Sequence, residues 1–373
     1  MTFSRRDFLR IMGAAGLMSQ PLAVLAARKV GTRALAFHGI SPDFSDRLIT
    51  APGMEWRLLL RAGQSLGKGL AFGDNNDYLQ FFPLSGHQHG ILWVNHEYYH
   101  PLFHSSPNRT LARVLEDRKL VGGSLVEIRQ GAEGWSLVEG SPYNRRVDGN
   151  TVIPFAGGRE VAGKKEAVGT FANCAGGITP WGTVLTCEEN YDMYYGERLH
   201  SQARTPSTWY DWDKFIDMPP EHYGWVVEVD PKAGAAKKHV TLGRFAHESA
   251  TVWVAPDKRP VVYSGDDAND EFIYKFIADR TDSLEQGTLY VADTLRGRWL
   301  PLVHTDPRLK KVFKDQTEVM VNCRQASRIL GATPQDRPED IEIDPRTSAV
   351  VIAMTNNKPA GRPYGKFLKL MEK

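Results

Sequence analysis

The residues in this chain best suited to chemistry are carboxylates that come directly after short apolar runs. They are Glu97 in WVNHE, Glu188 and Glu189 in LTCEEN, Glu248 in RFAHES, and Asp266 and Asp267 in VYSGDD. Carboxylates brought together by folding repel one another and raise each other's pKa unless a cation compensates. Such side chains supply the hard oxygen ligands that Ca²⁺ prefers. The pattern therefore predicts a metal site assembled from several segments, although any one of these acids alone would more often face water.

A second place for chemistry is the stretch NCAGGITPWGTVLTCEEN, residues 173–190, which contains Cys174 and Cys187. The stretch is compatible with a disulfide-linked hairpin, with a metal site, or with a strand–turn–strand whose acids face water. Because Cys323 brings the number of cysteines to three, at most one disulfide can form. A thiolate is the wrong ligand for Ca²⁺ and would instead indicate a softer transition metal such as iron or zinc.

The segment QDRPEDIEIDP, residues 335–345, places Arg337 and Glu339 on either side of Pro338. Proline fixes its own φ and restricts the residue before it, so the two side chains could be presented together. An arginine can clamp a phosphate or a carboxylate through two parallel hydrogen bonds. The alternative interpretation is a polar turn that leads into a strand at Ile341.

The elements that must position these residues are predicted to be β-hairpins. From Phe72 onward, alternating apolar runs are interrupted by turn residues, which is the signature of paired strands. The clearest turns are at residues 131–134, 230–234, 255–260 and 344–348. Repeated hairpins without long helices favour an all-β sandwich, barrel or propeller. We expect a propeller, because the ends of its inner strands converge on one axis and would gather the acids into one cavity.

Composition limits the class of protein. The chain has 373 residues and a formal net charge of +2, so no overall field favours binding to nucleic acid or to an anionic membrane. At the N-terminus, Arg5 and Arg6 precede an uncharged run from Ile11 to Ala27, which is typical of a twin-arginine export signal. This run is too short for a confident membrane span. We expect residues 1–27 to be a signal peptide and residues 28–373 to be a single domain in the periplasm or outside the cell.

Two segments depart from the hairpin pattern. His200–Gly224 is a long connection rich in aromatic residues and proline, and is either a lid or binding loop or an ordered surface excursion. The last eight residues, KFLKLMEK, resemble a strand with no partner after it. We therefore expect a propeller whose C-terminal closure is missing.

Seven motifs together carry a resemblance to a known family. SRRDFLR, WVNHE, GTFANCAGGITPWGTVLTCEEN, GRFAHES, YSGDD, RPEDIEIDP and MTNN occur in the order found in the PhoX family of bacterial alkaline phosphatases, from residue 4 to about residue 357. The resemblance implies a six-bladed β-propeller with a mixed cluster of iron (Fe³⁺) and Ca²⁺ on its axis. It also implies hydrolysis of phosphate monoesters outside the cytoplasm. The expected partners are small phosphate esters and the twin-arginine translocation machinery, and the expected oligomeric state is a monomer.

The resemblance further implies roles for individual residues. Cys174 matches the iron-binding cysteine, and Glu248 and Glu339 match carboxylate ligands of the metals. Arg337 would hold the substrate phosphate, which makes Arg337 and Glu339 the expected catalytic pair. The carboxylates expected on the calcium side of the cluster, or bridging it, are Glu97, Glu188 and Glu189. Cys187 is expected to pack in the core.

Two alternative functions remain open at the level of the sequence. One is a calcium-dependent propeller lactonase or a related hydrolase, which would need neither Cys174 nor Arg337. The other is a truncated propeller that binds without catalysis, because the family usually continues past the strand that ends in MTNN.

Overall fold

The computed structural model describes residues 39–100 and 109–372 of the chain. The chain divides into two units, Met1–Leu58 and Leu59–Lys373. In the first unit, the described residues 39–58 form no helix or strand. The predicted signal peptide, residues 1–27, lies outside the described residues, and so does its boundary with the rest of the chain. All elements named below belong to the second unit.

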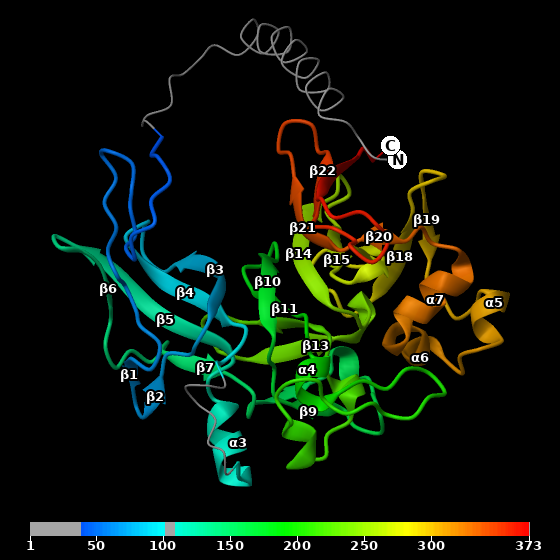
Figure 1. Cartoon of the computed structure of the whole chain (residues 1–373), viewed down its shortest axis with the longest axis horizontal. Helices are drawn as coiled ribbons and strands as arrows, with labels where there is room; N and C mark the ends of the chain where they lie inside the picture. Colours follow the sequence, from blue (N-terminus) through cyan, green and yellow to red (C-terminus); the bar gives the residue numbers. More distant parts are fainter. Residues whose placement is uncertain (1–38, 101–108, 373) are drawn as a thin grey trace, which may run out of the picture. The chain divides into compact units, whose positions relative to one another are not determined.

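Four antiparallel sheets of three to five strands follow one another along this unit (Figure 1). The first sheet contains β3 (Asn76–Pro83), β4 (His89–His96), β5 (Gly122–Gly131), β6 (Gly134–Leu137) and β7 (Arg145–Val147). The second contains β10 (Asn173–Ile178), β11 (Val184–Glu188), β12 (Val226–Val229) and β13 (Ala236–His239). The third contains β14 (His247–Val254), β15 (Pro260–Asp266), β17 (Ile273–Ala278), β18 (Gly287–Asp293) and β19 (Arg298–Pro301). The fourth contains β21 (Pro338–Ile343), β22 (Val350–Met354) and β23 (Lys366–Leu370).

The first strand of each large sheet is an edge strand, and these four strands lie beside one another. β10 contacts both β3 and β14, and β14 contacts β21, although each strand belongs to a different sheet. Sheets that radiate from a row of adjacent inner strands are the blades of a β-propeller. The predicted all-β propeller is therefore confirmed. The described residues form four of the six blades that the resemblance implies.

Smaller elements connect the blades. Three two-stranded ribbons pair β1 (Ser65–Gly67) with β2 (Leu70–Ala71), β8 (Val152–Pro154) with β9 (Glu166–Val168), and β16 (Asn269–Glu271) with β20 (Gln335–Asp336). The α-helices of the described residues are α3 (Leu111–Asp117), α4 (Asp192–Tyr195), α5 (Pro307–Lys310), α6 (Gln316–Val321) and α7 (Cys323–Leu330). The 3₁₀ helices are η1 (Ala156–Gly158), η2 (Trp212–Lys214), η3 (Pro220–His222) and η4 (Val240–Leu242). In the described part of the chain, no helix has the length and apolar character needed to cross a membrane.

The four predicted hairpins are confirmed as the pairs β5–β6, β12–β13, β14–β15 and β21–β22. The C-terminal strand predicted from KFLKLMEK is β23, and it pairs with the preceding strand β22 rather than with a later one. The carboxylate-bearing segments are not all inner strands, however. WVNHE, LTCEEN and VYSGDD end the second strands of their blades, and only RFAHES leads into a first strand.

Apolar side chains fill the spaces between neighbouring blades. Trp93 and Leu125 from the first blade pack with Val184 and Val227 from the second, and all four are fully buried. An equivalent cluster lies between the third and fourth blades. Face-to-face packing of this kind needs an apolar residue at alternate positions of each strand, which is the pattern visible in the sequence.

The Gly176-Gly177 pair in NCAGG allows the inner strands to approach closely. A Cβ atom on Gly177 would lie 2.0 Å from the carbonyl oxygen of Ala250 in β14. A Cβ atom on Gly176 would lie 2.5 Å from the ring of Tyr78 in β3. Since real Cβ atoms do not come so near to other atoms, glycine is required here, and it keeps β10 pressed between its two neighbours.

Candidate metal centre

The inner strand of every blade contains a β-bulge near its start. The register shifts between Asn76 and Leu79, Asn173 and Gly176, Glu248 and Thr251, and Pro338 and Ile341. A bulge inserts one extra residue and redirects the side chains around it. The residues at this point of the four strands are Asp77, Cys174, Glu248 and Glu339.

One hydrogen bond recurs in all four blades and shows which positions are equivalent. The backbone N–H of the residue that follows the second strand donates to the carbonyl oxygen two residues before the bulged position. The four pairs are Glu97 to Asn75 at 3.1 Å, Glu189 to Ala172 at 2.9 Å, Asp267 to Ala246 at 3.0 Å, and Thr355 to Arg337 at 3.3 Å. The start of each first strand and the end of each second strand therefore meet at one end of the blade, as antiparallel pairing requires.

Three of the residues whose carbonyl oxygens accept this hydrogen bond have left-handed backbone conformations, with φ of 42° at Asn75, 53° at Ala172 and 54° at Arg337. In the third blade the left-handed residue is instead Ser249, with φ of 67°. A residue with a Cβ atom is disfavoured in this region by about 1 kcal/mol or more. Strained backbone repeated at equivalent positions indicates that the direction of the following side chains matters.

Among the side chains at this end of the four blades, the closest group consists of Cys174, Glu189 and Glu248. Their potential ligand atoms all lie within 4.8 Å of one another. Burial, followed by the charges of Glu248 and Asp267, raises the pKa of Glu189 to about 10. Burial is also the largest cause that raises the pKa of Glu248 to about 8. Burial and the neighbouring Glu248 likewise hold the pKa of the Cys174 thiol well above its usual value. Groups in this environment are stabilised in their charged forms by a bound cation.

The remaining acids surround this group. Burial raises the pKa of Glu97, interactions with Tyr98 and Glu189 oppose this rise, and Asn75 Nδ2 donates to Glu97 Oε2 at 3.2 Å. The charge of Asp77 acts on both Glu97 and Glu248. Asp267 Oδ1 is buried and has no hydrogen-bond partner. One thiol, several carboxylates and a buried carboxylate oxygen without a partner make a donor set that fits metal ions.

Arg337 and Glu339 lie together at the edge of this group, as the sequence suggested they could. Arg337 Nη2 donates to Asp267 Oδ2 at 2.6 Å and lies 3.3 Å from Glu339 Oε1. The Arg337 side chain is 33% exposed, so part of its guanidinium remains available to another anion.

Glu188 is not brought to the group, although it is the immediate neighbour of Glu189. Its Oε1 accepts from Lys238 Nζ at 2.6 Å, and its Oε2 accepts from the backbone N–H groups of Gly224 and Trp225 at 2.9 and 3.0 Å. Consecutive side chains at the end of a strand point in opposite directions. The first acid of the pair therefore faces a buried lysine. The second faces Cys174 and Glu248, and these three residues are called the metal-binding group below.

The same division holds for the paired aspartates of the third blade. Asp266 forms a buried ion pair with Arg324 of α7, whereas Asp267 faces the group. Sequence reasoning placed Asp267 among the clustered carboxylates without giving it an individual role, and it did not identify Asp77. Asp77 could have been found by aligning the starts of the inner strands, where it occupies the position of Cys174.

The three cysteines are free and buried. Cys187 lies in the apolar cluster between the second and third blades, with Trp225 and Val226. Its predicted packing role agrees with this position, and the disulfide-linked hairpin does not form. Cys323 lies in the same cluster, at the start of α7.

The family described as alkaline phosphatase PhoX matches residues 35–372. Among solved structures, PhoX of Pseudomonas fluorescens in complex with vanadate, a transition state analogue, is similar with a TM-score of 0.78 and 30% sequence identity. The similarity covers 89% of this chain and 72% of that chain. No curated protein matches the chain.

Proposed function

Since the chain belongs to the alkaline phosphatase PhoX family and is a metal-dependent phosphoric monoester hydrolase, we propose that Cys174, Glu189 and Glu248 form the centre of its metal site. The observation that carries this proposal is the convergence of one thiol and two carboxylates within 4.8 Å, in a setting where burial raises the pKa of each.

The donor types support two kinds of metal. The thiolate of Cys174 favours a transition metal, for which we propose iron as Fe³⁺. The carboxylates of Asp77, Glu97 and Glu339 are hard oxygen ligands and favour Ca²⁺ at the rim of the group. Glu188 is excluded from this ligand set, because both of its oxygens already accept hydrogen bonds.

The substrate phosphate would be held by Arg337. When bound, the metal ions supply the positive charge that binds a phosphate dianion and activates a water molecule for attack. Arg337 adds a planar guanidinium whose N–H groups match two phosphate oxygens. Asp267 and Glu339 fix the direction of that guanidinium in advance, so little ordering is left for the transition state. Vanadate bound to the related Pseudomonas fluorescens protein supports phosphoryl transfer at this site.

We also propose that the protein is exported through the twin-arginine route to the periplasm or beyond, on the strength of Arg5, Arg6 and the uncharged run that follows them. The single domain over residues 28–373 and the monomeric state remain predictions.

The test compares two buried cysteines. Cys174→Ser should remove the transition metal and lower kcat/KM for para-nitrophenyl phosphate by at least about 10²-fold, since several kcal/mol of transition-state stabilisation depend on the metals. Cys187→Ser, an equally buried control in the apolar cluster, should retain both metal and activity. Glu339→Gln should lower activity and the calcium content. Metal content per folded protein is measured alongside each rate. Full metal loading and activity in Cys174→Ser would overturn the assignment.

A further inference from the structure

A pocket of about 650 Å³ lies between the end of the first blade and the connection that follows α4. Its lining is mainly aromatic and aliphatic, and its principal members are Asn75, Tyr98, Tyr99, Met193, Trp209 and Tyr210. Three of these come from the end of the first blade, and three come from α4 and the connection that follows it. We call it the aromatic pocket.

The aromatic pocket and the metal-binding group are both close to Glu97. Asn75 and Tyr98 line the pocket, Asn75 donates a hydrogen bond to Glu97, and Tyr98 follows Glu97 in the chain. Glu97 in turn interacts with Glu189, a member of the central group. Asn190, the residue after Glu189, donates from Nδ2 to the Tyr98 hydroxyl at 2.8 Å. The pocket therefore lies on the side of the central group that faces the first blade.

The wall that carries Trp209 and Tyr210 is held firmly in place. The Tyr210 backbone N–H donates to the Met193 carbonyl oxygen at 2.8 Å, and the Tyr210 hydroxyl donates to the Tyr99 carbonyl oxygen at 3.0 Å. The Tyr210 ring also stacks on Tyr194 at a centroid distance of 4.3 Å. The sequence left two roles open for the connection His200–Gly224, a lid or binding loop or an ordered surface excursion. These contacts show that the connection is ordered, and an ordered segment can still line a binding site.

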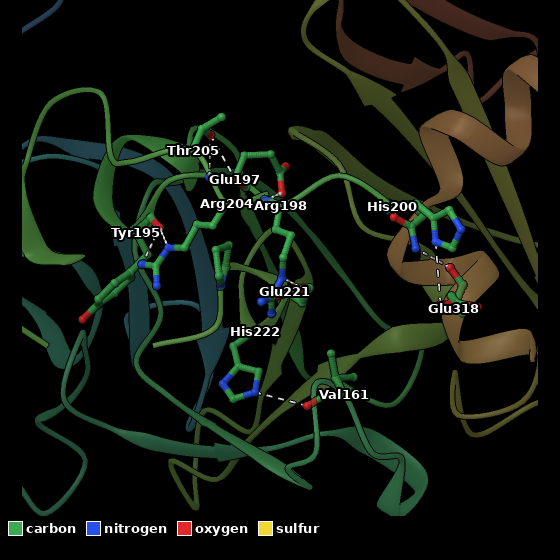
Figure 2. A network of polar contacts seen from close by, with 12 residues as sticks. Val161, Tyr195, Glu197, Arg198, His200, Arg204, Thr205, Glu221, His222 and Glu318 are labelled. Atoms are coloured by element: carbon green, nitrogen blue, oxygen red, sulfur yellow. Dashed lines mark hydrogen bonds and ion pairs between the residues drawn. The ribbon is translucent and has the colours of Figure 1, made fainter. Parts of the chain in front are cut away.

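Polar contacts fix the base of the same connection (Figure 2). Arg204 donates from Nε and Nη2 to the Tyr195 carbonyl oxygen at 3.1 and 2.7 Å. The backbones of Glu197 and Thr205 are hydrogen-bonded in both directions, at 3.3 and 2.8 Å. Because the connection is already ordered, a ligand that contacts it would lose little affinity to the ordering of the protein.

Trp209 differs from its neighbours in being exposed. Trp209 is 63% exposed, whereas Tyr210 and Trp212, which follow it in the chain, are buried. An exposed indole that lines a pocket with a fixed backbone offers a face for stacking without first breaking a protein contact. Aromatic and aliphatic walls with few charges suit an apolar or aromatic group rather than a second phosphate.

We propose that the aromatic pocket binds the organic group of the phosphate ester and selects esters whose organic group is an aromatic ring. This inference rests on the proposed function, because the phosphate must be anchored at the metal-binding group for its ester group to reach the pocket. Trp209 is then a specificity-determining residue that contacts the leaving group and takes no part in the reaction itself.

The first experiment measures kcat/KM for naphthyl phosphate and for ethyl phosphate with the metal-loaded protein. Trp209→Ala should lower the value for naphthyl phosphate about tenfold, as expected for the loss of a stacked ring and its buried area, and should leave ethyl phosphate within about twofold. Trp209→Phe should recover most of the loss. Trp135→Ala is the matched control, since Trp135 is also a partly exposed tryptophan but does not line the pocket. Equal effects of Trp209→Ala on the two substrates, or none on either, would overturn the inference.

A second variant protects the test against misfolding. Ala62 is an exposed member of the lining from a different segment, and Ala62→Trp adds bulk to the pocket without removing any contact of the connection. It should reproduce the selective loss for naphthyl phosphate. Unchanged selectivity in this variant would contradict the placement of the ester group.

Binding of naphthol to the protein, measured by saturation-transfer NMR, separates this inference from the proposed function. Naphthol binding that Trp209→Ala abolishes, in a protein without phosphatase activity, would refute the metal-site assignment but support the aromatic pocket. Hydrolysis of phosphate esters without naphthol binding would support the metal site and refute the aromatic pocket.

Discussion

The neighbouring acids Glu188 and Glu189 should respond in opposite ways when each is replaced by glutamine. Glu188 and Lys238 are both fully buried, and their charged atoms are 2.6 Å apart. Glu188→Gln leaves the ammonium buried without its counter-charge, and breaking a buried pair in this way costs about 3–5 kcal/mol. In this variant Lys238 Nζ retains its hydrogen bond to the carbonyl oxygen of His222 at 3.0 Å and its contact with the ring of Tyr223 at 4.6 Å. We therefore expect a loss at the lower end, about 3 kcal/mol, which corresponds to a fall in Tm of about 6 °C for a domain of this size.

Glu189→Gln should have the reverse effect. The groups that raise the pKa of Glu189 after burial are Glu248, Asp267 and Glu97, all of them acids. With a pKa of about 10, Glu189 must take up a proton to lie among these acids at neutral pH, whereas glutamine is already neutral, so the Tm of the metal-free protein should stay the same or rise. The metal content, however, should fall, because a neutral amide is a weaker ligand than a carboxylate.

The two variants are compared by thermal unfolding of the metal-free proteins and by metal analysis of the loaded proteins. The double variant Glu188→Gln, Lys238→Met should recover part of the lost stability, since it leaves no uncompensated charge. The reasoning fails if Glu188→Gln loses metal without losing stability, because Glu188 would then be a ligand and the alternation of the paired acids would be wrong.

Three further predictions follow from individual contacts. Arg337→Lys keeps the charge but loses the planar fork, so kcat/KM for phosphate esters should fall about 10²-fold with unchanged metal content. Burial lowers the pKa of His222 from 6.5 to about 4. The folded state then binds fewer protons than the unfolded state, so stability present above pH 6.5 is lost as the pH falls towards 4, and urea unfolding of His222→Gln should lack this dependence. Asp336 Oδ2 accepts from Lys366 Nζ at 2.7 Å, and Arg362 also pairs with Asp336. Asp336→Asn should therefore loosen β23, lowering the Tm by a few degrees and speeding proteolysis after residue 360, whereas proteolysis at the wild-type rate would contradict this.

The hairpins were predictable because their signals are local. A turn such as DPKAG and the alternation on either side of it lie within about twenty residues, and β12–β13 formed as expected. Helices α5 to α7 were not predicted, since each is short and α7 depends on packing against the third blade through Cys323 and Ala326. The C-terminal strand was predicted, but its partner was not, because the connection through residues 355–365, although rich in turn residues, is longer than the short loops that mark a hairpin.

The neighbourhood of the site was also predictable, but not the direction of each side chain. Successive side chains of a strand point to opposite faces, so Glu188 and Glu189 should point in opposite directions. The sequence, however, does not show at which residue the strand ends. The bulges make this harder, because one extra residue in each inner strand reverses the alternation that a sequence reader would count. Asp77 was missed for this reason, since only the recurring hydrogen bond of Glu97 to Asn75 reveals that it is equivalent to Cys174.

The charges at equivalent positions of the four blades also explain where the site can accept an anion. At the end of the second strand, the first three blades carry the acids Glu97, Glu189 and Asp267, whereas the fourth carries the neutral Thr355. Two residues before the bulge, the first three blades carry uncharged residues, whereas the fourth carries Arg337. Both changes make the fourth blade less negative than the others. Cations are therefore favoured beside the first three blades, and a phosphate dianion is favoured beside the fourth, where Arg337 is already oriented by Asp267.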